Sequence, residues 1–299
     1  MSLSLGEIVS QEASAVRAVR HLTDIIRASH EETLMGLERE LTNGAEALKR
    51  ANPAIAVGLG AACDLFMRYV TRTSALEAED FDTCKTRLIE RGEAFAATSA
   101  QARQKISALG VKLLSQEGTT VLVHGFSRCV LAVLYAAAQQ GRNFSVVVTE
   151  GRPDVQGIAS AQALKQAGVP VTVVLDAAAA YVMERVDLVL VGAEGVVENG
   201  GIVNKLGTYG LALAAKALGK PVYVAAESFK MVRLYPLNQR DLPEAEQPVD
   251  FGQALPNGVD VLNPIRDYTP PDLLTLLVTD LGLLTPAAVS DMLISLHAR

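Results

Sequence analysis

Three polar segments of the sequence carry the side chains whose types and spacing could do chemistry. The first holds His124, Gly125, Ser127 and Arg128, directly after a run of β-branched residues. The glycine permits a tight turn, and Ser127 can cap a helix beginning after it. Because the free N–H groups at a helix start favour an anion, this segment is a candidate seat for a phosphate, although an ordinary serine-capped turn explains it equally well. It is not the G-x-G-x-x-G fingerprint, so we expect no dinucleotide cofactor and assign none.

The second segment runs from Thr149 to Gly157 and places an acid, a base and an amide at one strand end. Arg152 offers the planar fork that suits a phosphate, with Asp154 and Gln156 beside it. The alternative is a helix start capped by Asp154, with a solvated arginine.

The third segment is the densest polar cluster. Glu194 follows a buried run, and two glycines separate it from Asn204, Lys205 and Thr208. The last three supply donors at the start of a predicted helix, so Lys205 could hold a phosphate. Glu194 could hydrogen-bond a sugar hydroxyl or act as an acid or base. Two polar turns without a ligand are the alternative.

Metal binding is not expected. His124 is the only histidine at a predicted strand end, and a buried, hydrogen-bonded imidazole explains it better than a metal ligand. The cysteines Cys63, Cys84 and Cys129 form no C-x-x-C pair, so we expect buried thiols.

The elements that must position these segments differ between the two parts of the chain. Over residues 1–117 the apolar side chains recur at helical spacing, which predicts a small bundle. Its four helices are expected from Val9 to Ile26, Leu34 to Leu48, Ile55 to Thr73 and Asp80 to Leu113.

Residues 118–299 predict a Rossmann-like α/β domain, a parallel sheet with crossover helices. Strands are expected over 120–124, 144–149, 170–175, 188–191 and 221–225, with helices over 128–140, 155–167, 177–184 and 205–218. Two further segments follow over 271–281 and 286–297. Since ligands bind at the carboxyl ends of such strands, the three polar segments should meet there. Residues 227–271 hold seven of the 12 prolines and predict a long loop, either a binding segment or a surface excursion.

The composition excludes several classes of protein. The net charge is −6 and the pI is about 5.4, which argues against direct binding of nucleic acid. No apolar run is long enough to span a membrane, and Glu7 and Glu12 stand where a signal peptide would carry cations. We therefore expect a cytosolic protein.

The strings TEGRPDVQG, VGAEGVVENGGIVNKLGTYGLALAAKA, YVAAESFK and DYTPPDLLTLLVTDLGLLTPAAVSD resemble the family shared by sugar phosphate isomerases and the regulatory subunits of eukaryotic translation initiation factor 2B. Within it, HGFSRCVL and AESFKMVRLYPLNQRDLP are similar to the alpha subunits. The resemblance spans essentially the whole chain.

In the methylthioribose-1-phosphate and ribose-1,5-bisphosphate isomerases of this family, the pattern has a catalytic cysteine after the first-strand histidine and an aspartate after the Gly-Ala of the fourth strand. This sequence has Gly125 and Glu194 there. Glycine cannot transfer a proton, and the longer acid would misplace its carboxylate. Four other positions match the family's binding residues, so the resemblance implies a non-catalytic sugar phosphate pocket. Its expected residues are His124, Ser127, Arg128, Arg152, Gln156, Glu194, Asn204 and Lys205.

The resemblance further implies a regulatory subunit of the guanine nucleotide exchange factor for translation initiation factor 2. Such subunits form a homodimer through the α/β domain and join the beta, gamma, delta and epsilon subunits in a decamer. The helical domain would help to sense the phosphorylated alpha subunit of initiation factor 2. The candidates for phosphoserine contact are Arg17, Arg20, Arg39 and Arg68, although a solvated charge on a helix face explains each of them better. The alternatives are an active sugar phosphate isomerase and an unrelated nucleotide-binding enzyme on the same architecture.

Overall fold

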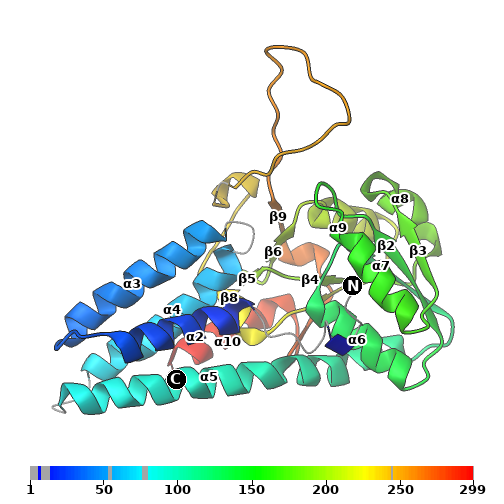
Figure 1. Cartoon of the computed structure of the whole chain (residues 1–299). Coiled ribbons are helices and arrows are strands. Elements are labelled where there is room, and N and C mark those ends of the chain that lie inside the picture. The colour runs from blue at the N-terminus through cyan, green and yellow to red at the C-terminus, as the bar shows by residue number, and fades with distance from the viewer. Residues whose placement is uncertain (1–5, 8–13, 53–55, 76–79, 244, 299) are drawn as a thin grey trace.

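The computed structural model describes residues 6–7, 14–52, 56–75, 80–243 and 245–298. Between residues 14 and 110, the described part of the chain forms the four predicted helices (Figure 1). They are α2 (Ser14–Ala28), α3 (Leu34–Ala51), α4 (Ala56–Ala75) and α5 (Phe81–Gly110). The expected helix starts at Val9 and Ile55 lie outside the described residues.

The helix starts follow ordinary capping chemistry. The Thr33 hydroxyl accepts a hydrogen bond from Gly36 N–H, and the Asp80 carboxylate accepts one from Thr83 N–H. The side chains facing inward form one apolar cluster, in which Leu22, Leu41 and Phe66 are fully buried. This cluster is the stripe that the helical spacing predicts.

A seven-stranded sheet forms the centre of the α/β part, in the order β11-β10-β7-β4-β1-β2-β3. The strands are β1 (Thr119–His124), β2 (Phe144–Thr149), β3 (Val171–Val174), β4 (Leu188–Gly192), β7 (Val222–Ala225), β10 (Leu276–Thr279) and β11 (Gly282–Leu284). All pairs are parallel except β10 with β11. The predicted α/β architecture and its five strands are confirmed; β10, within the 271–281 segment, and β11, directly after it, were not predicted.

Both faces of this sheet are covered. The helices are α6 (Arg128–Gln139), α7 (Gln156–Gln166), α8 (Ala179–Val182), α9 (Thr208–Ala217) and α10 (Val289–Ala298). The side chains of α6 and α7 share one apolar core with the end of α5. Those of α8, α9 and α10 share the other. Continuous apolar strands follow from this double burial.

A second, four-stranded sheet in the order β8-β5-β6-β9 was not predicted from the sequence. Its strands are β5 (Gly195–Val197), β6 (Ile202–Lys205), β8 (Met231–Val232) and β9 (Arg266–Thr269). The helix expected from Lys205 begins only at Thr208, because Gly207 has φ +102° and breaks the helical path. Asn204 and Lys205 therefore lie at the end of a strand.

Two other expectations change in detail. The helix predicted over 177–184 is one four-residue turn, α8, between two 3₁₀ turns. The long loop predicted over 227–271 contains β8 and β9, and only its middle projects from the body (Figure 1).

The predicted boundary at 117/118 falls between a 3₁₀ turn (Val111–Leu114) and β1, and the division into two domains stays a prediction. No helix in the described ranges is long and apolar enough to cross a membrane.

Candidate functional site

A pocket of about 500 Å³ lies where the helical part meets the carboxyl ends of β1 and β4. The helical part contributes Ser14 and Ala15 of α2 and Gly58 and Leu59 of α4. The opposite wall comes from the sheet and its connections. The pocket thus lies between the helical and α/β parts, at the sheet edge where the sequence analysis placed it.

Six of the eight predicted site residues line this pocket, and two do not. The lining residues are Ser127, Arg128, Gln156, Glu194, Asn204 and Lys205. His124 and Arg152 lie outside the lining.

His124 is a buried structural side chain. Its Nδ1 lies 2.6 Å from the Thr149 hydroxyl and its Nε2 lies 2.8 Å from the Leu206 carbonyl oxygen. Because a carbonyl can only accept, Nε2 carries the proton and donates it, and Thr149 donates to Nδ1. Burial lowers the pKa of His124, which favours this neutral ring. Within the described residues, no group of three or more His, Cys, Asp or Glu side chains could hold a metal ion.

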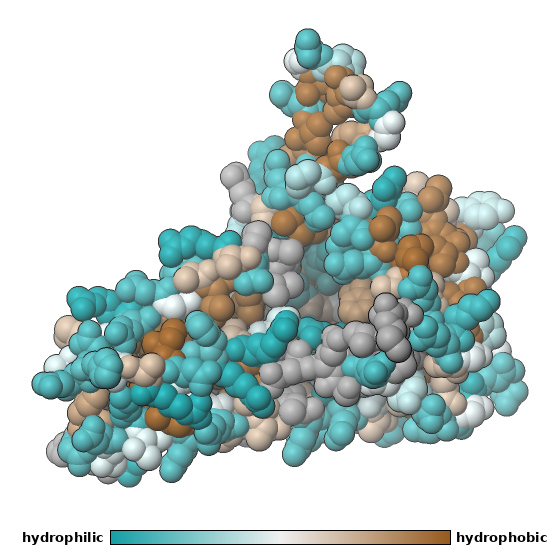
Figure 2. All heavy atoms as spheres, viewed as in Figure 1, coloured by the Kyte–Doolittle hydropathy of each residue, from teal (hydrophilic) through white to brown (hydrophobic). Residues whose placement is uncertain are grey.

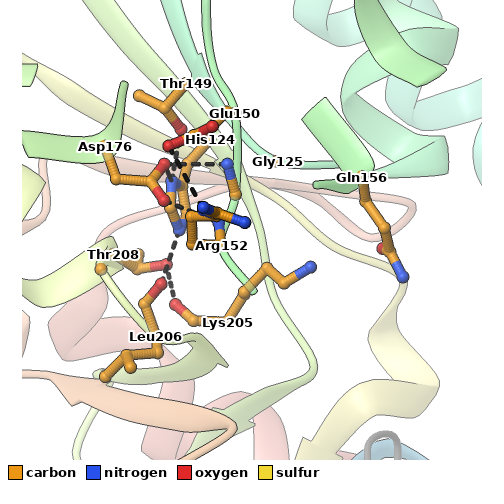
Figure 3. A network of polar contacts seen from close by, with 12 residues as sticks. His124, Gly125, Thr149, Glu150, Arg152, Gln156, Asp176, Lys205, Leu206 and Thr208 are labelled. Carbon is orange, nitrogen blue, oxygen red and sulfur yellow. Dashed lines mark hydrogen bonds and ion pairs between the residues drawn. The ribbon is translucent and has the colours of Figure 1, made fainter. Parts of the chain in front are cut away.

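Arg152 belongs to an exposed turn beside the network around His124 (Figure 3). Its side chain is 61% exposed, and its Nε lies 3.9 Å from the Glu150 carboxylate. The backbone N–H groups of Gly151 and Arg152 donate to Asp176 at 2.8 and 2.7 Å. The turn is therefore held by its backbone hydrogen bonds, and the Arg152 guanidinium is exposed to solvent.

Ser127 caps α6, as the sequence predicts, by accepting a hydrogen bond from Val130 N–H at 3.4 Å. This helix start lies against the end of β4. A Cβ added at Gly192 would lie 2.3 Å from the Ser127 hydroxyl, so only glycine fits there. Arg128, the first residue of α6, is mostly buried and donates to the Ser14 hydroxyl at 3.4 Å. The cation thus bridges α6 and α2 beside the pocket.

Lys205 reaches the pocket from the end of β6 and forms an ion pair with Asp154. Both side chains are largely buried. Asn204 donates to the Thr208 hydroxyl at 3.0 Å, and this hydroxyl donates to the Lys205 carbonyl at 2.6 Å. These bonds fix the strand end, while Gln156 stands apart from the His124 network (Figure 3). The cations that line the pocket are Arg128, Lys205 and Lys230, and the amide side chains are Gln156, Asn204 and Gln247.

Glu194 ties the two parts of the protein together. Its Oε1 accepts a hydrogen bond from Val57 N–H at 2.9 Å, in the first turn of α4. Arg266 Nη1 lies 3.7 Å from the same oxygen. A Cβ added at Gly58 would lie 2.6 Å from the Glu194 carbonyl oxygen, so glycine permits the close contact. Burial raises the pKa of Glu194, and these partners oppose the shift. The carboxylate is committed to holding α4.

A buried ionic cluster at the pocket floor was not predicted from the sequence. The Glu227 carboxylate lies 3.0 Å from Lys230 Nζ and 3.4 Å from Arg103 Nε. Burial alone would raise the pKa of Glu227, but Lys230, the Cys129 thiol and Arg103 lower it to about 2. Lys230 also donates to the Ala193 carbonyl at 2.9 Å. The string AESFK contained two of these residues, but nothing in it indicated a partner on a distant helix.

The thiol of Cys129 belongs to this cluster. Burial and the nearby Glu227 raise its pKa, so the sulfur is protonated and cannot act as a base. The expectation of buried thiols is confirmed for Cys63, Cys84 and Cys129.

Comparisons with known proteins match this architecture. The model of the Initiation factor 2 subunit family matches residues 7–286. The chain is 45% identical to translation initiation factor eIF2B subunit alpha of Dictyostelium discoideum, over 97% of this chain and 94% of the relative. It is 36% identical to the Caenorhabditis elegans protein of that name, over 96% and 93%.

Isomerases are also relatives. The chain is 30% identical to ribose 1,5-bisphosphate isomerase of Pyrococcus furiosus, over 96% of this chain and 88% of the relative. The tetrameric eIF2B-beta2-delta2 complex of C. thermophilum has the same fold, with a TM-score of 0.76, 21% identity and coverage of 94% and 88%. The order of elements, the pocket and the similarity over nearly the whole chain agree, and this chain belongs to the Initiation factor 2 subunit family.

Proposed function

We propose that this chain is a regulatory, non-catalytic subunit of the exchange factor for translation initiation factor 2, of the alpha type. The observation that carries the proposal is the commitment of Glu194: in the place of a catalytic acid, its carboxylate accepts Val57 N–H at 2.9 Å. Gly125 has no side chain that could transfer a proton, and the Cys129 thiol is protonated. The two eIF2B alpha relatives, at 45% and 36% identity, support the same function.

The pocket of this subunit binds a sugar phosphate without converting it. Arg128 and Lys205 supply positive charge, and Gln156 and Asn204 supply amide donors. The phosphate replaces Asp154 as the partner of Lys205, because both carry negative charge. The start of α6 adds backbone N–H donors, as a helix N-terminus does for an anion.

The partners of the subunit are a second copy of the chain and the beta, gamma, delta and epsilon subunits of the exchange factor, in the cytosol. The beta2-delta2 complex named among the structural relatives supports an assembly of this fold. The helical part contributes to recognition of phosphorylated initiation factor 2 alpha subunit. Arg17 and Arg39 are exposed there, on α2 and α3, and can reach a phosphoserine.

The test is affinity purification of the tagged full chain from its own cells, with mass spectrometry and measurement of the particle mass. Two copies of this chain with the four other subunits would support the proposal. Recovery of a bare homodimer would contradict it. An assay of ribose 1,5-bisphosphate turnover then decides between a binding protein and the isomerase that the Pyrococcus furiosus relative exemplifies.

A further inference from the structure

The helix α9 begins without a cap of its own, shortly after the pocket residues Asn204 and Lys205. Its N-cap position is Gly207, which has no side chain and has φ +102°. The free backbone N–H groups of a helix start normally bind the side chain of the residue before the helix. Here the Gly207 and Tyr209 nitrogens donate to Asp267 Oδ2 at 2.8 and 3.0 Å. The cap of α9 therefore comes from another element, β9.

Asp267 lies beside the strand end that carries the two pocket residues. In the antiparallel pairing of β6 with β9, Asp267 stands opposite Asn204, and Arg266 stands opposite Lys205. Asn204 and Lys205 line the pocket, whereas Asp267 does not. The Thr208 hydroxyl, in the first turn of α9, accepts from the Asn204 side chain and donates to the Lys205 carbonyl. The position of the α9 start thus determines where both pocket residues lie.

The turn from β6 into α9 is anchored from outside at two places. On the strand side, Leu206 N–H donates to the Ile265 carbonyl at 3.0 Å, and the Leu206 carbonyl accepts from His124 Nε2 at 2.8 Å. On the helix side, Asp267 holds the N–H groups of Gly207 and Tyr209. Without its carboxylate the turn would be anchored on the strand side alone.

The carboxylate of Asp267 is unfavourable to bury. Asp267 is 6% exposed, although residues 251–262, shortly before it in the sequence, are all exposed and form the projection at the top of Figure 2. Its Oδ1 has no hydrogen-bond partner on another described residue. Burial raises the pKa of Asp267 to about 7. Asparagine would fill the same space and accept the same bonds without a buried charge, so the carboxylate indicates a role other than stability.

Backbone groups, not ionic partners, hold this carboxylate. The titratable or charged side chains on the elements around it are His124 at the end of β1, Lys205 on β6, Arg266 on β9 and Tyr209 on α9. Lys205 and Arg266 form ion pairs with Asp154 and Glu194. Burial raises the pKa of Asp267, and backbone N–H groups oppose this shift. The charge of Asp267 therefore acts on the start of α9.

We propose that Asp267 is a positioning residue of the pocket: its charged carboxylate holds the start of α9 and so keeps Asn204 and Lys205 in place for a sugar phosphate. Hydrogen bonds to an ionised group are roughly twice as strong as those between neutral groups. A charged Asp267 therefore holds the turn more firmly than a protonated one or an asparagine. The inference rests on the sugar phosphate pocket of the proposed function and adds a residue that controls its affinity.

The test measures the dissociation constant of ribose 5-phosphate by calorimetry at pH 6 and pH 8, for the natural chain and for Asp267→Asn. The ratio of the two constants at one pH cancels the titration of the ligand itself. We expect the variant to bind about fivefold more weakly at pH 8, where Asp267 of the natural chain is mostly charged. At pH 6 the natural carboxylate is mostly protonated, so the ratio should approach one. Asp267→Ser, a second neutral acceptor, serves if the asparagine variant does not fold.

Asp241→Asn is the matched control. The Asp241 carboxylate also accepts two backbone N–H groups, from Leu237 at 2.7 Å and Asn238 at 3.1 Å. It does not line the pocket. Its variant should bind ribose 5-phosphate as the natural chain does at both pH values.

The melting temperature separates a positioning role from a purely structural one. At pH 8, Asp267→Asn should gain melting temperature while it loses affinity, whereas loss of a purely structural contact lowers both. Equal dissociation constants at pH 8 would overturn the proposal and leave the binding of sugar phosphate intact. An equal loss at pH 6 and pH 8 would also overturn it, because the charge would then play no part. A natural chain that binds no ribose 5-phosphate at either pH would contradict the pocket of the proposed function, and this inference with it.

Discussion

The Glu194 carboxylate lies 2.9 Å from the backbone nitrogen of Val57, across a separation of 137 residues in sequence. This bond caps the first turn of α4 with a side chain from the end of the central sheet. A helix is normally capped by its own preceding residue. Here the cap also joins the helical part to the α/β part, beside the pocket.

The length of this side chain should decide whether the cap forms. Glu194→Gln keeps an acceptor oxygen at the same reach, so the bond to Val57 is kept, and the free energy of unfolding changes only through the 3.7 Å pairing with Arg266 Nη1. Glu194→Asp shortens the side chain and breaks the bond, so it should lower the free energy of unfolding by about 1 kcal/mol, as loss of a cap does. Urea denaturation measures both. If the aspartate and glutamine variants are equally stable, the bond to Val57 contributes nothing.

The buried carboxylate of Glu227 should make the protein sensitive to acid. Its pKa falls from the ordinary 4.5 to about 2 in the folded protein, so its stabilisation is fully present above pH 4.5. It is lost as the pH falls toward 2, and amounts to about 3 kcal/mol in total. Glu227→Gln should remove this dependence and destabilise the protein at pH 7 by about 3 kcal/mol or more, because Lys230 and Arg103 lose their counter-charge. The exposed Glu117 provides the control, as Glu117→Gln. The free energy of unfolding is measured from pH 3 to 7 for the natural chain and the two variants. The same dependence on pH in all three would contradict the prediction.

Asp267 should act in the opposite sense. Burial raises its pKa from 3.8 to about 7, although Gly207 and Tyr209 N–H groups at the start of α9 favour the charged form. The stabilisation by a protonated Asp267 is fully present below pH 3.8 and is lost as the pH rises through 7, by about 4 kcal/mol. Asp267→Asn retains an acceptor and should be more stable than the natural chain at pH 8. The melting temperatures of the variant and the natural chain are compared at pH 5 and at pH 8. If the variant gains no melting temperature over the natural chain between pH 5 and pH 8, the raised pKa of Asp267 is contradicted.

Lys205 should be required for binding a sugar phosphate. At a ligand concentration of 100 Kd, binding stabilises the folded chain by about 2.7 kcal/mol, which raises its melting temperature. Lys205→Ala should abolish the shift measured with ribose 5-phosphate. Arg152→Ala is the matched control, since Arg152 does not line the pocket, and should keep the shift. A shift that persists without Lys205 places the phosphate elsewhere.

Most of the main sheet could be predicted because its central strands, such as β1 and β4, are buried on both faces. The run of β-branched residues over Phe144–Thr149 coincides with β2, and the polar residues after the first, second and fourth strands do gather at one edge. The second sheet could not be predicted, because β8 has two residues and β5 has three. So short a strand shows no alternation, and its pairing depends on residues far away in sequence.

The sequence predicts where the site residues lie in the fold, but not which way their side chains point. Lys205 and Gln156 line the pocket as expected, whereas Arg152 follows the same strand edge and leaves its guanidinium exposed. The difference comes from Asp176, which fixes the turn through backbone bonds that the sequence does not reveal. The cluster around Glu227 was missed for a related reason: its partner Arg103 lies on a helix of the other part.

The pocket walls include Ser14 and Ala15 near one end of the sequence and Ile265 near the other. A nascent chain on the ribosome therefore cannot form the pocket until residues 14–265 have been synthesised and the first helices have docked onto the sheet. A fragment without α2, or one that ends before Ile265, lacks part of the wall. A small molecule that binds in the pocket would select completed, correctly folded chains over truncated ones before any larger assembly begins.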